Sequence, residues 1–333
     1  MAVTRARLSY EVMLRLALRA TAVALVPTVA PALSATALGH GAAATSPDLS
    51  TLVTGWSFEA HVWLPIVLAI AAYHWAVRVV DRAHPGNRVP RRRTVAWDAG
   101  LAVILVALQS PIGTYDTTLF SVHMVQHVLL MMVAAPLLAL GAPITLLLRL
   151  AKPKVRRGMI LPILHSRAVR LISFPVVAWV LFAAVMYLSH FSPLFDAALE
   201  SEPVHIGEHA LYLGAALLFW WPVVGADPSP WRLPHAVRIF YLFLGMPWSS
   251  FLGLAIISAS VPLYPHYATQ SRDWGPTPLE DQQLAGGIMW AGGDAAFLVA
   301  LILAVVVWLR AEDSEGRRID AKLERERAHL RAE

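Results

Sequence analysis

Residues 121–143 read SVHMVQHVLLMMVAAPLLALGAP, a long apolar run that begins with two histidines four positions apart. A helix needs about 20 mostly apolar residues to cross the hydrocarbon core of a bilayer, and this run is long enough. Ionisable side chains are costly inside a membrane and are usually functional there. The stretch therefore predicts a transmembrane helix that carries a functional site.

The rest of the 333-residue chain has the composition of a membrane protein. Hydrophobic residues make up 57% of it and charged residues only 15%. A soluble domain with this balance would have to expose large apolar patches. We therefore expect an all-α fold, a polytopic membrane helix bundle with seven transmembrane helices. The expected spans are residues 57–80, 94–112, 119–148, 170–190, 204–224, 237–260 and 282–309.

The chain divides into three predicted segments. Residues 1–45 combine an Arg-bearing start, an apolar stretch and small residues, which is typical of a signal sequence, with an extra N-terminal helix as the alternative. Residues 57–309 form the seven-span membrane domain. Residues 310–333 mix both signs of charge at helical spacing and predict a charged cytoplasmic tail, either a solvated helix or a disordered end.

Basic residues define the expected topology. Of the 27 Lys and Arg residues, all except Arg272 lie on alternate connections between the spans. The positive-inside rule places those connections and the C-terminus in the cytoplasm of a bacterial cell, so the plasma membrane is the expected location. The basic segment 149–170 is expected to contact membrane lipid at the inner surface. Because topology explains the net charge of +5, no nucleic-acid partner is predicted.

Two histidine pairs form the candidate site. His123 and His127 are at positions i and i+4, so their rings project from one helix face. His205 and His209 repeat this spacing at the start of the run 204–224. Both pairs fall at the outer ends of their predicted spans. If the two helices face each other, the four imidazoles could close one metal site. The alternative is that each histidine is an interhelical hydrogen-bond partner near the interface.

The neighbouring residues bear on which metal would bind. Imidazole suits copper, zinc, nickel and iron, and a nearby thioether favours Cu(I). Met131 continues the histidine stripe one turn deeper, and Gln126 lies beside it. Glu208 could be an outer acceptor that fixes a histidine tautomer. The chain has no cysteine, which excludes disulfides and thiolate sites.

The start of the seventh predicted span supplies two more candidates, Asp281 and Gln282. The favoured interpretation of Asp281 is a cap or first-turn acid that interacts with the helix dipole, and the alternative is a role in closing the histidine cluster. Small residues permit close packing of membrane helices. This role is predicted for Gly286, Gly287, Gly292 and Gly293.

Four stretches carry a resemblance to a known family: HMVQHVLLMMVAAPLLALGAP, HIGEHALYLGAALLFWWPVVG, LYPHYATQ and PLEDQQLAGGIMW. In this order they resemble the multi-span CtaG-type cytochrome c oxidase assembly factors, over roughly residues 57–309. The resemblance implies an integral membrane factor that matures a haem–copper oxidase, with copper as cargo and an oxidase subunit as partner. The matching motif positions are His123, Gln126, His127, His205, Glu208, His209, Asp281 and Gln282.

We therefore expect an assembly factor that binds copper near the outer face and delivers it to cytochrome c oxidase. One alternative is a membrane protein with a single b-type haem, held by opposed histidines such as His127 and His209. Another is a transporter for a metal or small solute, although the sequence has no strong inverted repeat. A conventional enzyme is not expected, because the sequence has no phosphate loop, nucleophile elbow or HExxH motif.

Overall fold

A computed structural model describes residues 46–270 and 272–330, and this part of the chain folds into helices without any strand. The predicted signal sequence or extra helix at residues 1–45 lies outside the described residues. The first half contains α2 (Leu49–Thr54), α3 (Ala60–Ala83), α4 (Arg91–Gln109), α5 (Pro111–Tyr115), α6 (Phe120–Val128), the π-helical turn η1 (Leu129–Ala134), α7 (Ala135–Leu140), α8 (Pro143–Leu150), α9 (Pro153–Val155), η2 (Arg156–Ile160), α10 (Leu161–Leu164) and α11 (Arg167–Ile172). The second half contains α12 (Pro175–His190), α13 (Leu194–Glu200), α14 (Glu202–Val224), α15 (His235–Ser258), α16 (Pro265–Thr269), α17 (Pro278–Gly287), η3 (Ile288–Gly292) and α18 (Gly293–Leu330).

Five stretches of the described chain are long and apolar enough to cross a membrane. They are α3, α4 with α5, the run Phe120–Leu150, α15, and the run Pro278–Arg327. α12 and α13 qualify only as a pair, bent by 67° at the break between them, which gives a sixth span if the pair is one. The predicted membrane helix bundle is confirmed, whereas the count of seven spans is not.

The predicted span at 204–224 corresponds to α14, which is 23 residues long but is not one of the five. His205, Glu208 and His209 lie in its first turns and lower its hydropathy. α14 packs against α7 and α12, and His205 and Glu208 are buried. The polar residues that make α14 a weak membrane helix by composition therefore face the inside of the bundle.

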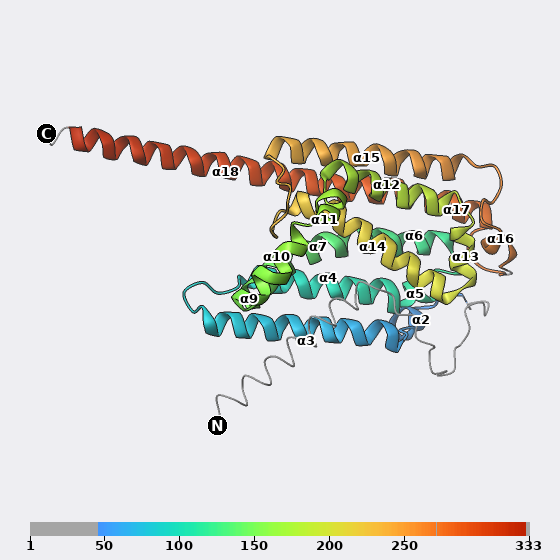
Figure 1. The fold of residues 1–333 in the computed structure, drawn as a ribbon. Helices are drawn as coiled ribbons and strands as arrows, with labels where there is room; N and C mark the ends of the chain where they lie inside the picture. The colour runs from blue at the N-terminus through green and yellow to red at the C-terminus, as the bar shows by residue number, and fades with distance from the viewer. Residues whose placement is uncertain (1–45, 271, 331–333) are drawn as a thin grey trace, which may run out of the picture.

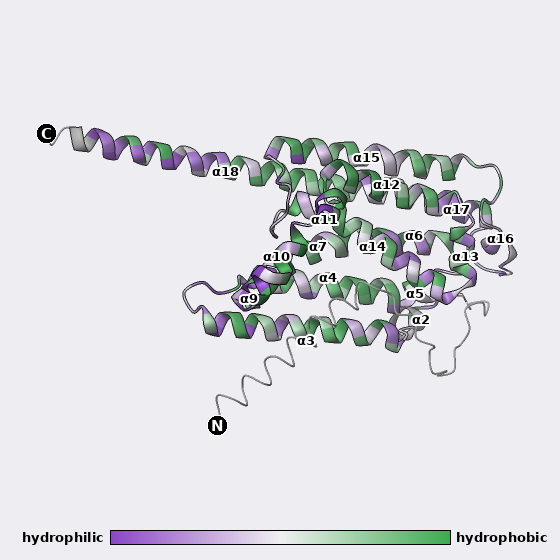
Figure 2. Ribbon diagram, viewed as in Figure 1, coloured by the Kyte–Doolittle hydropathy of each residue, from purple (hydrophilic) through white to green (hydrophobic). Residues whose placement is uncertain are grey.

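The long helices run side by side, and α18 continues well beyond them as a separate arm (Figure 1). The protruding part of α18 is mostly hydrophilic, whereas the helices of the bundle are mostly hydrophobic (Figure 2). The predicted C-terminal tail is thus helical as far as Leu330. α5, α13 and α16 gather at one end of the bundle, which we call the histidine end, and α9 lies toward the other (Figure 1).

An aromatic core joins four helices of the bundle. Phe219 of α14 lies 4.7 Å from Phe182 of α12 and 4.8 Å from Tyr241 of α15, measured between ring centroids. Trp220 stacks on Phe297 of α18 at 6.0 Å. These separations lie in the range where aromatic pairs attract each other. The core fixes α14 in the middle of the bundle, where its histidines can meet those of α6.

Glycines allow α17 and α18 to approach α15 closely. A Cβ on Gly286 would lie only 2.7 Å from the carbonyl oxygen of Gly253, and a Cβ on Gly293 would also overlap α15. Among the described residues, nothing lies within 4 Å of a Cβ on Gly287, and Gly292 has only a loose contact at 3.8 Å. The predicted packing role is therefore confirmed for Gly286 and Gly293 and wrong for Gly287.

Candidate metal centre

The four predicted histidines meet in one cluster between α6 and α14. Ring centroids lie 4.3 Å apart for His123 and His127, and 4.2 Å apart for His205 and His209. Across the helices, His123 lies 5.3 Å from His205, and His127 lies 5.8 Å from His209. The two helices therefore face each other, as a four-imidazole site requires.

The two histidines of α6 already have the spacing of metal ligands. Nε2 of His123 lies 2.9 Å from Nε2 of His127, and both side chains are buried. Two metal–nitrogen bonds of about 2.0–2.1 Å, at right angles to each other, would place their nitrogens about 2.9 Å apart. A small ion could replace the proton that the two rings share.

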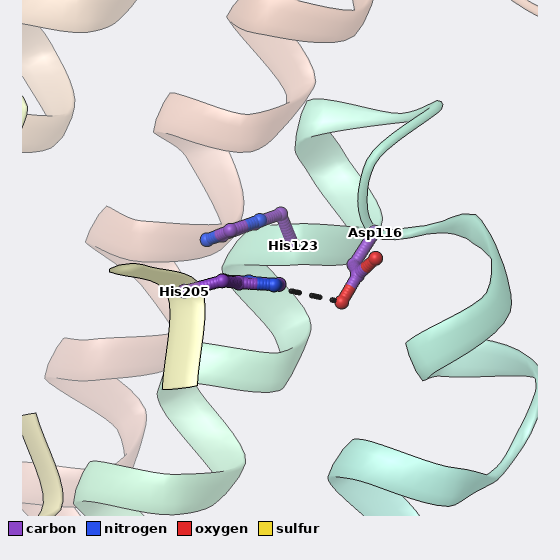
Figure 3. Close-up of side chains that lie close together, drawn as sticks. All are labelled: Asp116, His123 and His205. Carbon is purple, nitrogen blue, oxygen red and sulfur yellow. Dashed lines mark ion pairs between the residues drawn. The ribbon is translucent and has the colours of Figure 1, made fainter. Parts of the chain in front are cut away.

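Two carboxylates extend the cluster into two groups of three ligands. Asp116, His123 and His205 form one group, and His123, His127 and Glu208 form the other. Within each group the candidate ligand atoms all lie within 4.8 Å of one another. Figure 3 shows the first group, in which Asp116 points toward His205, with 4.0 Å between its Oδ2 and the imidazole Nε2.

Sequence reasoning missed Asp116. It is the only acidic residue in the connection 112–120, which lies directly before the HMVQH motif. A lone acid so close to the histidine pair could have indicated a further ligand. Burial raises the pKa of its carboxyl to about 7, against the opposing effect of a hydrogen bond from Gln126. Near neutral pH an incoming cation would therefore compete with a proton for this group.

Glu208 is buried without the partners that a carboxylate needs. Within the described part of the chain, neither of its oxygens has a hydrogen-bond partner. The Nδ1 atoms of His123 and His127 are also buried without a hydrogen-bond partner among the described residues. Oε2 of Glu208 lies 3.9 Å from Nε2 of His123. This distance is too long for a hydrogen bond but is possible for two atoms that bind the same metal ion. Orphaned buried polar atoms need an explanation, and a cation held between a carboxylate and imidazoles supplies one.

Gln126 connects the two histidine helices and the acidic ligand. Its amide nitrogen donates to Oδ2 of Asp116 at 2.9 Å and to the carbonyl of Ala107 at 3.0 Å. Its oxygen accepts a hydrogen bond from Nε2 of His209 at 2.9 Å. This bond puts the His209 proton on Nε2 and leaves Nδ1 with a free lone pair, as outer groups commonly do for metal-binding histidines.

Asp281 caps the helix that carries His123 and His127. Its Oδ2 accepts the backbone N–H of Phe120 at 2.6 Å, and its Oδ1 accepts the Ser121 hydroxyl at 2.5 Å. Leu119, the residue before α6, makes no side-chain cap. Asp281 is also a first-turn acid of its own helix, α17. It therefore satisfies the orphan N–H groups of a helix 160 positions earlier in the chain.

Gln282, beside Asp281, secures the segment that follows α15. Its oxygen accepts the N–H of Leu263 at 2.6 Å, and its amide donates to the carbonyls of Ile256 and Val261, each at 3.3 Å. Asp281 and Gln282 thus hold the backbone around the site and belong to neither ligand group.

Met131 lies one turn deeper, in η1, and is buried in the aromatic core. Its carbonyl accepts the indole N–H of Trp220 at 2.9 Å. In a π-helical turn the donor to this carbonyl would be the residue five positions later, which is Pro136, and proline has no N–H. The carbonyl of Met131 is therefore free to accept the indole N–H of Trp220, and this hydrogen bond joins α14 to η1 one turn below the histidines.

His190, at the end of α12, is a further histidine beside the cluster. Its ring lies 6.4 Å from that of His127. Nδ1 donates to the carbonyl of Met186 at 2.8 Å, and Nε2 is buried without a hydrogen-bond partner among the described residues. The sequence placed His190 at the correct end of a span, but an isolated histidine carried no signal of a role.

Comparison with known proteins identifies the family. Residues 71–311 match the family described as cytochrome c oxidase caa3 assembly factor (Caa3_CtaG). The chain belongs to this family. The matched region contains Asp116, all four clustered histidines, Glu208 and Asp281, so the whole candidate metal centre lies inside the part shared with the caa3 assembly factors.

Curated relatives come from mycobacteria. Uncharacterized proteins of Mycobacterium bovis and Mycobacterium tuberculosis are 32% identical over 282 residues, and one of Mycobacterium leprae is 30% identical. The alignments cover 82% of this chain and 42% of each relative, so the chain spans less than half the length of these proteins. No solved structure matches the chain significantly.

In this member of the caa3 assembly factor family, replacing Asp281 by alanine should loosen the start of α6. Loss of a helix cap costs about 1–2 kcal/mol, and we expect that loss in the thermal unfolding of the detergent-purified protein. Gln283→Ala, at an exposed position on the same helix, is the matched control and should leave the midpoint unchanged. Equal midpoints for Asp281→Ala and the control would show that this cap does not hold α6.

Proposed function

We propose that this protein is an integral membrane assembly factor for cytochrome c oxidase that binds copper between α6 and α14 and delivers it to an oxidase subunit. Family membership supports the assembly role. The observation that carries the copper role is the meeting of His123, His127, His205 and His209 in one cluster. The mycobacterial relatives carry no stated activity that bears on the cargo.

The donor set supports copper as the cargo. Neutral imidazoles can hold Cu(I) without burying further net charge, and a nitrogen-rich set with one carboxylate also suits Cu(II). His123 and His127 are close enough to bind one ion together. The ring of His205 lies 5.3 Å from that of His123, and the ring of His209 lies 5.8 Å from that of His127. Stepwise exchange of one imidazole for another would move the ion without releasing it to water.

The proposed topology places the histidine end on the outer side of a bacterial plasma membrane and the C-terminus in the cytoplasm. The charged arm of α18 and the basic segment 149–170 support this orientation through the positive-inside rule. In this arrangement the bent pair α12–α13 and α14 also cross the membrane, which brings the number of spans from five to seven. An oxidase subunit on the outer side could then reach the histidine end.

Copper analysis tests the proposal. The full-length protein, purified in detergent and loaded with copper, should retain the metal after desalting, and His127→Ala together with His209→Ala should remove it. His165→Ala is the matched control, because His165 is exposed and bonds the carbonyl of Leu161 instead. Unchanged copper content in the double variant would refute the site.

The same preparation tests the alternatives. Axial haem ligation through Nε2 of His209 would break the hydrogen bond of this atom to Gln126, whereas binding of a small ion through Nδ1 would keep it. We expect no Soret band in a visible spectrum of the loaded protein, and a strong one would support the haem alternative. Copper flux into vesicles that contain the protein would support transport instead.

A further inference from the structure

A cavity of about 240 Å³ lies between α3, α4, α6 and α14 and connects exposed groups with the buried cluster. Its walls include Glu59, His61 and Glu202, whose side chains are 45%, 39% and 48% exposed. They also include Asp116 and His205, which are buried. The cavity therefore links the surface to one of the two ligand groups.

The exposed part of the cavity concentrates negative charge around an imidazole. Nε2 of His61 lies 3.6 Å from the carboxylate of Glu59, and Nδ1 lies 4.0 Å from that of Glu202. Glu59 is held in place by Gln109, which donates to its carboxylate at 3.1 Å and accepts its backbone N–H at 2.9 Å. Two carboxylates with a low-dielectric wall behind them attract cations and raise their local concentration.

The two ligand groups differ in their access to this cavity. Asp116 and His205 line it, whereas His123, His127 and Glu208 lie behind its walls in the described structure. His123 belongs to both groups. Each group also offers one carboxylate and two imidazoles, so an ion has the same formal ligand charge in either position.

We propose that the cation reaches the centre through this cavity, is bound first by Asp116, His123 and His205, and then passes to His123, His127 and Glu208. The proposal rests on the function proposed above and names the route and order of loading. In the transfer, the bonds to Asp116 and His205 break, bonds to His127 and Glu208 form, and His123 is a ligand in both positions. The ion keeps its oxidation state, so no redox partner is needed.

The orphaned carboxylate of Glu208 is the independent observation that favours the second position. Its two oxygens are buried and have no hydrogen-bond partner among the described residues. An ion that stopped at Asp116 would leave this carboxylate uncompensated. Glu59 and His61 lie before residue 71, where the family match begins.

Loading kinetics test the route. Cu(I) is supplied without oxygen as its cationic acetonitrile complex to the metal-free, full-length protein in detergent, and the copper left unbound, measured at timed intervals as its coloured bicinchoninate complex, gives both rate and stoichiometry. Replacing Glu59 and Glu202 together by glutamine should slow loading about tenfold or more, as loss of electrostatic steering does, with unchanged final stoichiometry. Glu200→Gln, exposed near Glu202 but not on the cavity wall, is the matched control.

A second variant tests the cavity itself. Ala210→Phe places a ring in the cavity wall and should slow loading with unchanged stoichiometry, whereas Ala72→Phe, exposed on α3 and away from the cavity, should not. Wild-type loading rates in both the glutamine double variant and Ala210→Phe would overturn the route and leave the copper site standing. Failure of the wild-type protein to take up copper at all would instead overturn the proposed function.

Discussion

Replacing Glu208 by leucine should stabilise the metal-free protein and weaken its binding of copper. The Glu208 carboxylate is buried with no hydrogen-bond partner among the described residues, and an unsatisfied buried polar group costs about 1–3 kcal/mol. Leucine removes that cost, so the thermal midpoint of the metal-free protein should rise. Copper affinity should fall at least about tenfold, because even groups that only orient a ligand contribute that much.

Opposite signs for stability and binding distinguish a ligand from a structural residue. A carboxylate that held the helices together would lower stability when removed. Glu200→Leu, at an exposed position on α13, is the control and should change neither the midpoint nor copper affinity. A lower midpoint for Glu208→Leu would indicate a structural partner for the carboxylate, and unchanged copper affinity would exclude it as a ligand.

The histidine cluster could be predicted because its signal is local. Residues at i and i+4 share a helix face whatever the tertiary structure, so each pair of imidazoles was defined by spacing alone. The facing of α6 and α14 was an additional assumption, and the 5.8 Å separation of His127 and His209 supports it. Spacing within a helix thus predicted the four histidines of the candidate site.

The acidic half of the site depends on contacts between distant segments. Asp116 lies in a connection, where no periodicity indicates which way the chain folds back. Glu208 was predicted as an outer acceptor of a histidine proton, whereas its nearest imidazole nitrogen is 3.9 Å away. Asp281 caps a helix 160 positions earlier, a contact that no local pattern predicts.

The count of seven spans is not confirmed, for a related reason. Hydropathy describes how a helix would contact lipid, but α14 places His205, Glu208 and His209 against other helices instead. Its polar first turns are stabilised by the bundle, and composition alone cannot show that. At the bend between α12 and α13, Pro193 stands before the first residue of α13, and Phe195 is fully buried beside His123.

Two adjacent glycines should respond to alanine with opposite signs. A Cβ on Gly286 would lie 2.7 Å from the carbonyl oxygen of Gly253 and 2.7 Å from Cγ1 of Ile257, so α17 and α15 would have to separate. Such overpacking costs about 1–3 kcal/mol. A Cβ on Gly287 meets nothing within 4 Å in the described structure, and alanine gains up to about 1 kcal/mol over glycine in a helix.

Thermal unfolding of the two purified variants measures both effects under one set of conditions. Gly286→Ala should lower the midpoint, and Gly287→Ala should keep or raise it. Because α17 also carries Asp281, separation of α17 from α15 should loosen the cap on α6, so Gly286→Ala should also lose copper while Gly287→Ala keeps it. If Gly286→Ala unfolded no earlier than Gly287→Ala, the close approach of these two helices would be wrong, and with it the support that Asp281 gives to the histidine helix.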